Sequence, residues 1–407
     1  MSKSVRTALI GVSSLVVLYA LLGALLGKNG TNRQTYRNLG VYSEVLSRIK
    51  RHYVTEPNLD LATEGALRGL LETLDPYSTY FTAEEYRLYE ENQQKSHVGP
   101  GLVLWKRFGY GAVISVLPGS PAEKAGLRSG DLIEMVDDAS TRTLSLIQIE
   151  EKLKGPEGSE TTLSVIRESR GKTRKITLTR ARFPYPAVTT KVLEKTVGYL
   201  RIPSFEKGKA RETRSRLQAL MKNGARKIIV DVRDSATGDP SEAAETANFF
   251  LEGGLITFLE GQRHPRQDFV AEAGKAFCKL PLALLIDSTT AGPAEIFASA
   301  ILENKRGEAI GERSFGMGSV LKAVPFDDGS ALLLSVAKYH TPSGKKIQGE
   351  GVDPTVEESF PLEPRPAEDE EGIETPRQLL REKFGTGSDP QLKKALEVLR
   401  EAVPKAA

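Results

Sequence analysis

The amino-acid sequence predicts an α+β protein of several domains: a helical N-terminal part, a β-rich domain of sandwich or barrel-like type, and a β-α-β core with a largely parallel sheet. Three observations predict this architecture. Residues 34–93 carry apolar side chains at helical spacing, residues 96–183 contain short β-branched strands between turn signals, and residues 187–358 contain two continuous apolar runs of strand length. The length of 407 residues is enough for two or three domains.

Composition and charge exclude several classes of protein. Hydrophobic residues make up 39% of the chain, which excludes wholesale disorder and a polytopic membrane protein. The 56 basic and 53 acidic residues nearly cancel, so the chain lacks the basic footprint of a nucleic-acid binder. The single cysteine, Cys278, excludes a disulfide framework, and the four histidines show no metal-ligand spacing. We therefore expect no metal, no cofactor and no nucleic-acid partner.

The N-terminus contains a segment that is long and apolar enough to cross a membrane. The nineteen residues from Ala8 to Leu26 would span about 28 Å as a helix, close to the thickness of the hydrocarbon core. Lys3 and Arg6 precede this segment, and no convincing small-residue cleavage site follows it. Residues 1–29 are therefore expected to form an uncleaved signal anchor, with a cleaved signal peptide and a buried core helix as the alternatives.

The helical part and the β-rich domain differ in the spacing of their apolar residues. Between residues 34 and 93, the runs YSEVLSRIKRHYV and LATEGALRGLLETL predict helices, and Asp75-Pro76 stops the second one. Between residues 96 and 183, the runs GAVISVL, TTLSVIR and KITLTRA predict strands. One short helix is expected near residues 145–154.

The C-terminal half predicts a buried sheet followed by a tail. The runs KIIVDVR and LALLID are continuous apolar strands, and the helix-like run PSEAAETANFFLEGG lies between them. A further helix is expected at Ala294–Asn304. Residues 361–376 form an acidic, proline-rich linker with too little apolar content to fold. Residues 377–407 form a tail with an amphipathic helix that opens with Asp389 and Pro390.

The segment 113–138 reads VISVLPGSPAEKAGLRSGDLIEMVDD and resembles the PDZ domain of bacterial proteases. The resemblance implies a groove in which a peptide adds as an extra strand, with its terminal carboxylate held by the loop Gly99-Pro100-Gly101-Leu102. Because proline has no N–H, only Gly101 and Leu102 can donate, which weakens carboxylate capture by about 1.5–3 kcal/mol. The alternative is that the chain itself covers this groove.

Several further motifs occur in one order and together resemble the C-terminal processing peptidases, also called tail-specific proteases. They are LDPYSTYF, GYLRIPSF, IIVDVR, AEIFASAILEN and AKYHTPSGKKIQGEGVDP, and the match runs over about residues 40–358. The resemblance implies a serine-type endopeptidase in which a lysine takes the proton of the serine and backbone N–H groups stabilise the oxyanion. It also implies that residues 96–183 form the PDZ domain and residues 187–358 the peptidase-like domain.

The positions that the resemblance assigns to catalysis carry no catalytic side chains. The serine position is Gly292, the lysine position is Met317, twenty-five residues later, and the position of the supporting glutamine is Leu321. In the oxyanion region, Thr237 replaces a glycine of the family pattern, next to Gly238. Methionine and leucine fill the space of a lysine stem and of a glutamine without burying a charge or an amide.

These observations predict a catalytically inactive homologue of the family, anchored in the inner membrane by a single pass, with its soluble part in the periplasm. Its expected role is to bind peptides or protein C-termini, or to regulate a working protease. Two alternatives stay open. One is an endopeptidase that uses Ser288 or Thr290 together with a nearby lysine. The other is an oligomeric scaffold, a homo-oligomer in which the terminal helices make the contacts.

Overall fold

The computed structural model describes residues 30–94, 98–167, 173–359 and 389–401. The chain forms two compact units, Met1–Leu67 and Arg68–Ala407, which are described separately. The expected signal anchor, the expected acidic linker and the first part of the expected tail lie outside the described residues. None of the helices in these ranges is long and apolar enough to span a bilayer.

The first unit consists of helices that bury no core of their own. Helix α2 spans Gly30–His52, and helix α3 spans Leu59–Glu72 and continues into the second unit. Both lie where the sequence predicts helices. None of the residues 36–67 is buried. The side chains of Tyr36 and Leu39 are 68% and 56% exposed, so this unit presents apolar surface to solvent.

The β-rich domain contains one antiparallel sheet and the short helices α5 and α6, and its strands lie in the region where the sequence predicts them. Its strand order is β2-β3-β4-β6-β7, with β5 beside β4. The elements are β2 (Leu102–Arg107), β3 (Tyr110–Val116), α5 (Pro121–Lys124), β4 (Leu132–Val136), β5 (Ala139–Ser140), α6 (Leu146–Leu153), β6 (Glu160–Ile166) and β7 (Thr173–Thr179). Helix α6 begins with a capping box between Ser145 and Gln148 and packs Ile149 into the core. Strand β2 is an edge strand of this sheet.

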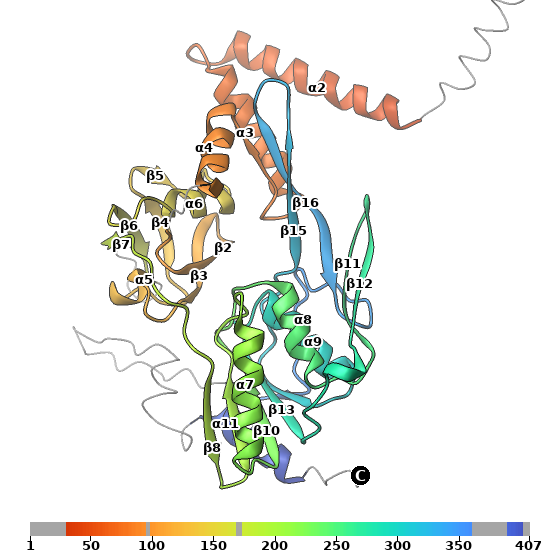
Figure 1. Ribbon diagram of the computed structural model, residues 1–407. Coiled ribbons are helices and arrows are strands. Elements are labelled where there is room, and N and C mark those ends of the chain that lie inside the picture. The colour runs from red at the N-terminus through yellow and green to blue at the C-terminus, as the bar shows by residue number, and fades with distance from the viewer. Residues whose placement is uncertain (1–29, 95–97, 168–172, 360–388, 402–407) are drawn as a thin grey trace, which may run out of the picture. The chain divides into compact units, whose positions relative to one another are not determined.

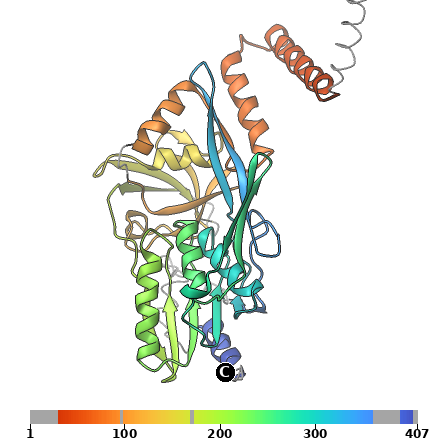
Figure 2. The ribbon, with the colours of Figure 1, turned by 45° about the vertical axis from the view of Figure 1, so that its right-hand side comes forward.

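The C-terminal half forms three layers around a mostly parallel sheet (Figures 1 and 2). The strand order is β17-β14-β13-β10-β9-β8, and all neighbours are parallel except β8 and β9. The strands are β8 (Thr189–Leu193), β9 (Val197–Arg201), β10 (Lys227–Asp231), β13 (Leu282–Ile286), β14 (Glu308–Gly311) and β17 (Val356–Glu357). The helices are α7 (Lys209–Lys222), α8 (Pro240–Asn248), α9 (Pro293–Glu303) and α11 (Pro390–Glu401). Ile228 and Val230 share a cluster with α7, α8 and α9, whereas Ile229 between them packs against α11, because strand side chains alternate in direction.

A third sheet has the strand order β1-β16-β11-β12, with β15 beside β16. Its elements, with the short helix η1, are β1 (Thr79–Phe81), β11 (Leu255–Gly261), β12 (His264–Val270), η1 (Ala273–Lys275), β15 (Ser319–Pro325) and β16 (Ala331–His340). Strand β1 corrects the expectation that residues 34–93 are helical throughout. The Asp75 carboxylate accepts the N–H groups of Tyr77 and Ser78 (2.9 and 2.8 Å), which ends the preceding helix. β-Branched and aromatic residues then pair with β16 before α4 (Ala83–Gln94) begins.

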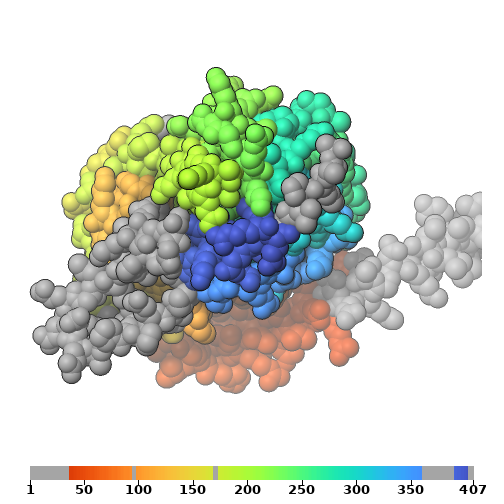
Figure 3. Space-filling view, turned by 90° about the horizontal axis from the view of Figure 1, so that it is seen from below, coloured from red at the N-terminus to blue at the C-terminus, as the bar shows by residue number. Residues whose placement is uncertain are grey.

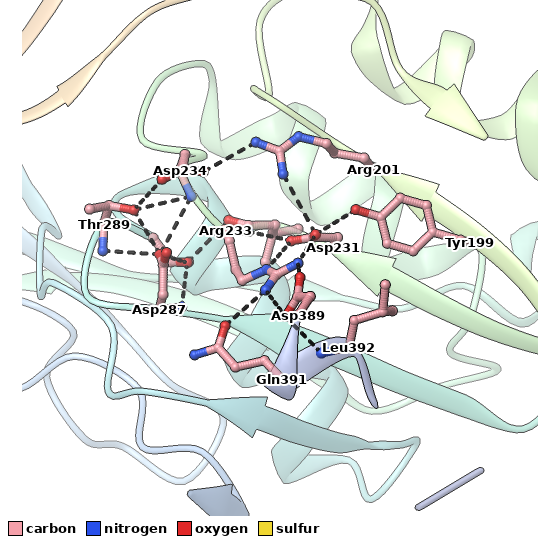
Figure 4. Close-up of polar contacts among 12 residues, drawn as sticks. Tyr199, Arg201, Asp231, Arg233, Asp234, Asp287, Thr289, Asp389, Gln391 and Leu392 are labelled. Carbon is pink, nitrogen blue, oxygen red and sulfur yellow. Dashed lines mark hydrogen bonds and ion pairs between the residues drawn. The ribbon is translucent and has the colours of Figure 1, made fainter. Parts of the chain in front are cut away.

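Helix α11 is fixed to the parallel sheet by a buried network of charges (Figure 4). Arg233 is 1% exposed and forms ion pairs with Asp231 (2.6 Å) and with Asp389 (2.9 Å), which caps α11. Burial opposes its charge, but the two carboxylates raise the pKa of Arg233 above its usual value. The network continues into the loops after β10 and β13, where Thr289 donates to Asp234 (3.0 Å). Figure 3 shows α11, in dark blue, at the surface of this end of the second unit.

Candidate functional site

Gly292 lies at the start of α9, in a turn that faces Met317. It is the N-cap of α9, with φ 60° and ψ −122°, a conformation that favours glycine. A Cβ atom placed on Gly292 would lie 3.9 Å from Met317 Sδ and 3.8 Å from the carbonyl oxygen of Ala236. The structure therefore brings together the two positions that the sequence assigns to nucleophile and base, and leaves room for a side chain between them.

Glu295 holds these two turns together through one buried carboxylate. Its Oε2 accepts the N–H groups of Gly292 (2.9 Å) and Met317 (2.7 Å). Its Oε1 accepts the N–H of Gly316 (2.7 Å) and the hydroxyl of Ser314 (2.5 Å). Burial raises the pKa of Glu295 to about 7, although the four donors favour its charged form. Glu295 thus fixes the backbone of both turns, while the expected nucleophile and base positions themselves are Gly292 and Met317.

Met317 and Leu321 are packing residues at the contact between the β-rich domain and the C-terminal half. Both are partly buried and pack against the core of the β-rich domain. Met317 also packs, like Trp105 and Phe315, against a buried cluster that joins the two domains. The rings of Trp105 and Phe315 meet edge to face, with their centroids 5.0 Å apart. The expected base and its orienting partner are therefore replaced by apolar contacts.

The loop after β10 carries the residues of the expected oxyanion region. Gly238 has φ 128°, and an added Cβ would lie 2.1 Å from the carbonyl carbon of Phe205, so this position requires glycine. The Thr237 carbonyl accepts the N–H of Phe205 (2.9 Å), whereas the Thr237 hydroxyl is buried without a hydrogen-bond partner in the described part of the chain. Ala291 donates its N–H to the Ser235 carbonyl (2.9 Å), which holds this loop against the Gly292 turn.

Pro293, the first residue of α9, is a site residue that sequence reasoning overlooked. The first N–H groups of a helix have no partner inside the helix, so they can bind an oxyanion beside a residue at the N-cap. Proline has no N–H, and this donor is therefore absent next to Gly292. The signal was available in the sequence as a proline directly after the nucleophile position.

The other hydroxyl groups near this turn contact acidic residues and backbone. Thr290 Oγ1 donates to the Val232 carbonyl (3.1 Å), and Thr289 Oγ1 donates to the Asp287 carboxylate (2.7 Å). Ser288 is exposed. Among the residues that the structure describes, no lysine is hydrogen-bonded to these hydroxyl groups, and no cluster of three or more His, Cys, Asp or Glu side chains could hold a metal ion. The geometry therefore gives a relocated hydroxyl–lysine pair no support.

A cavity of about 410 Å³ lies between the β-rich domain and the segments that carry Thr237 and Met317. It is lined by Tyr77, Gly99, Pro100, Gly101, Leu102, Val103, Leu104, Ile147, Glu150, Leu153, Lys154, Ala236, Thr237, Met317, Ser319 and Leu321. All four residues of the expected carboxylate loop are in this lining, together with the lysine and glutamine positions of the family pattern. The expected carboxylate loop and two of the three expected catalytic positions, Met317 and Leu321, therefore line one cavity. Met317 and Leu321 form part of its wall but do not fill it.

Comparisons with known proteins match both parts of this site. Peptidase family S41 matches residues 196–358, and the PDZ domain matches residues 113–167. The chain is 31% identical to the carboxy-terminal-processing protease of Bartonella bacilliformis, over 81% of this chain and 77% of that protein. It is 30% identical to the carboxy-terminal processing protease CtpA of Bacillus subtilis, over 78% of this chain and 68% of that protein. The structure of a photosystem II D1 C-terminal processing protease is similar with a TM-score of 0.65 and 25% identity, over 79% of this chain and 93% of that one.

Proposed function

Because this chain belongs to the carboxy-terminal processing proteases of peptidase family S41, we propose that it is a catalytically inactive member that binds peptides or protein C-termini. The observation that carries the proposal is the Gly292 turn, where a Cβ atom would lie 3.9 Å from Met317 Sδ. A serine-type peptidase that uses lysine needs a hydroxyl and a neutral amine at these two places.

Four parts of the reaction machinery are missing at this turn. Gly292 has no attacking oxygen and Met317 has no amine. Leu321 cannot orient an amine by a hydrogen bond, and Pro293 offers no N–H to an oxyanion. Loss of the nucleophile alone lowers turnover by about 10⁶-fold in an unrelated serine protease. The combined loss leaves no route to peptide-bond hydrolysis at this turn.

The groove supports a role in binding. Strand β2 is an edge strand, so its outer N–H and C=O groups are available for pairing with an added strand. The cavity beside it is open and mostly apolar, which suits the side chains of a peptide terminus. A regulator or partner of a working protease would need only this binding step.

We also propose that the chain is anchored in the inner membrane, with its soluble part in the periplasm. The support is the apolar segment Ala8–Leu26, which follows Lys3 and Arg6. Such an anchor would hold the groove close to membrane-bound partners. Membrane fractionation of cells that produce the chain, followed by protease treatment of spheroplasts, should find the protein in the membrane and its soluble part accessible. Recovery in the soluble fraction would contradict the anchor.

Labelling with a serine-directed fluorophosphonate tests the loss of the nucleophile. The purified full chain should not react, under conditions in which a relative with the serine and lysine in place reacts fully. A label on the wild type that disappears in Ser288→Ala or Thr290→Ala would show a relocated nucleophile and contradict the proposal.

An oligomeric scaffold is the second candidate, and the exposed apolar side chains of α2 favour it. Tyr36, Leu39 and Val45 are 68%, 56% and 48% exposed. Surfaces of this kind are often covered by a partner in solution. Light scattering should then report a dimer or larger for the wild type and a smaller species for Leu39→Ser. A monomeric wild type would remove this candidate.

A further inference from the structure

The groove gives a bound peptide a defined direction. Leu117 donates its N–H to the Gly101 carbonyl (2.9 Å), so Leu102 and Val116 form a non-hydrogen-bonded pair of the antiparallel ladder. The N–H of Leu102 therefore points away from β3, toward the open edge of β2. A peptide strand can pair with this edge in the antiparallel sense and end at the carboxylate loop.

Two charged side chains line this mostly apolar cavity: Glu150 of α6 and Lys154, the C-cap residue of that helix. Lys154 lies at the end with the carboxylate loop, because its Cγ would be 3.9 Å from a Cβ placed on Gly99. The next residue, Gly155, pairs with Val98 through two backbone hydrogen bonds (3.0 and 3.1 Å). Glu150 lies one helical turn earlier, about 6 Å further along the groove. Among the lining residues, Glu150 is the single carboxylate and Lys154 the single cation.

Within the described residues, no side chain or backbone group forms a hydrogen bond or an ion pair with the Glu150 carboxylate. Burial raises the pKa of Glu150 to about 7. The groups that face it are Lys154, which favours its charged form, Glu151, which opposes it, and the buried hydroxyl of Tyr77. The Glu150 side chain is half-buried, and its carboxylate is available to pair with a cation bound in this mostly apolar cavity.

We propose that the groove selects peptides with a free carboxyl terminus and a lysine or arginine at the third residue from the end, and that Glu150 is the specificity-determining residue. Residues of a strand advance by about 3.4 Å each, so the 6 Å between Lys154 and Glu150 corresponds to about two peptide residues. Side chains two residues apart point to the same face of a strand, so both can face α6. The inference rests on the proposed peptide-binding function.

The terminal residue of such a peptide meets a different environment. Leu153, Met317 and Leu321 line the cavity and give its side chain apolar contacts. Leu102 offers its N–H to the terminal carboxylate. Lys154, whose ammonium is ion-paired with Glu151 (2.7 Å), lies at the same end, where Pro100 cannot donate. A ligand with a negative terminus and a positive third-last residue would thus meet Lys154 at the end of the groove and Glu150 further along it.

Fluorescence anisotropy with matched peptides tests this assignment. Three labelled decapeptides with the same apolar last residue and a free carboxylate would carry lysine, norleucine or glutamate at the third-last position. They would be titrated at pH 8 into the full chain, Glu150→Gln, and the control Glu160→Gln, which changes an exposed residue of β6. We expect the wild type and the control to bind the lysine peptide about tenfold more tightly than the norleucine peptide. Glu150→Gln should bind these two peptides within about twofold of each other.

The outcomes separate this inference from the proposed function. If the wild type binds all three peptides equally well, Glu150 does not select the ligand, while peptide binding itself stands. A lysine preference that persists in Glu150→Gln also overturns the assignment. If no peptide binds at millimolar concentration, both the inference and the peptide-binding function are wrong. Glu150→Lys gives an independent check, because it should prefer the glutamate peptide.

Discussion

The Gly292 turn and the peptide groove are linked by Met317, which faces Gly292 and also lines the cavity, but they depart from the family pattern in different ways. At the turn, the backbone frame is complete, since Glu295 accepts four hydrogen bonds, while the side chains for chemistry are replaced. At the groove, one backbone donor is lost at Pro100, while the open space and the charged side chains of α6 remain. The comparison teaches that the backbone contacts that hold a turn of this fold in place do not depend on the side chains that the family pattern assigns to catalysis.

The largest effect should come from removing the carboxylate that holds the turn. Glu295→Ala leaves three backbone N–H groups and the Ser314 hydroxyl without their acceptor in a buried site. We expect the free energy of unfolding to fall by about 3 kcal/mol or more. Urea denaturation should show this loss, whereas Glu245→Ala, on the exposed side of α8, should change stability by less than about 0.5 kcal/mol. Equal stability of the two variants would show that Glu295 does not hold the Gly292 and Met317 turns in place.

The next effect concerns the oxyanion donor that Pro293 removes. A variant with Gly292→Ser, Met317→Lys and Leu321→Gln restores nucleophile, base and orienting partner but not this N–H. Adding Pro293→Ala to this variant should raise its turnover of a fluorogenic peptide by roughly 10²-fold, because removing one oxyanion donor from a serine protease lowers turnover by about that factor. Similar turnover with and without Pro293→Ala would show that the N–H of this residue takes no part.

At the groove, the preference for a lysine peptide should depend on pH. The pKa of Glu150 is raised to about 7, so its carboxylate is charged above that pH and neutral below it. The wild type should bind the lysine peptide about tenfold more tightly than the norleucine peptide at pH 8, and should bind the two about equally at pH 5.5. Glu150→Gln should show no such change, which separates Glu150 from the neighbouring Lys154, Glu151 and Tyr77. A preference that is constant from pH 5.5 to 8 would contradict the role of Glu150.

The smallest effect is expected from the peptide's own terminus. Because Pro100 removes one N–H from the carboxylate loop, amidation of the peptide should weaken binding by only about three- to fivefold. A full set of donors would make the same change cost on the order of a hundredfold. Anisotropy with matched acid and amide peptides measures the difference. A loss near a hundredfold would show that the loop captures carboxylates without the missing donor.

Local patterns in the sequence predicted much of this structure and the register of the altered site. The apolar runs at β10 and β13 and the helix at α9 lie where expected, and so the twenty-five-residue spacing places Gly292 opposite Met317. Contacts between distant segments were not predictable in this way. Strand β1 pairs with β16, and Arg233 pairs with Asp389, because the folded chain brings them together, and neither contact leaves a periodic signal.

The lining of the groove also depends on contacts that the sequence pattern does not predict. The motif predicted a carboxylate loop, whose residues line the cavity, but it did not show that Glu150 lines the same cavity, because that depends on which face of α6 meets β2. Pro293 was visible in the sequence, and its consequence became clear once Gly292 was seen at the N-cap of α9.

The central claim is that this chain binds peptides without cleaving them, and one assay tests it directly. The full chain is mixed with a labelled peptide that has a free, apolar carboxyl terminus and lysine at the third-last position. Anisotropy measures the bound fraction, and mass spectrometry of the same sample measures cleavage. We predict saturable binding with the peptide intact after a day of incubation. Cleavage that is lost in Ser288→Ala or Thr290→Ala, or the absence of any binding, would contradict the account.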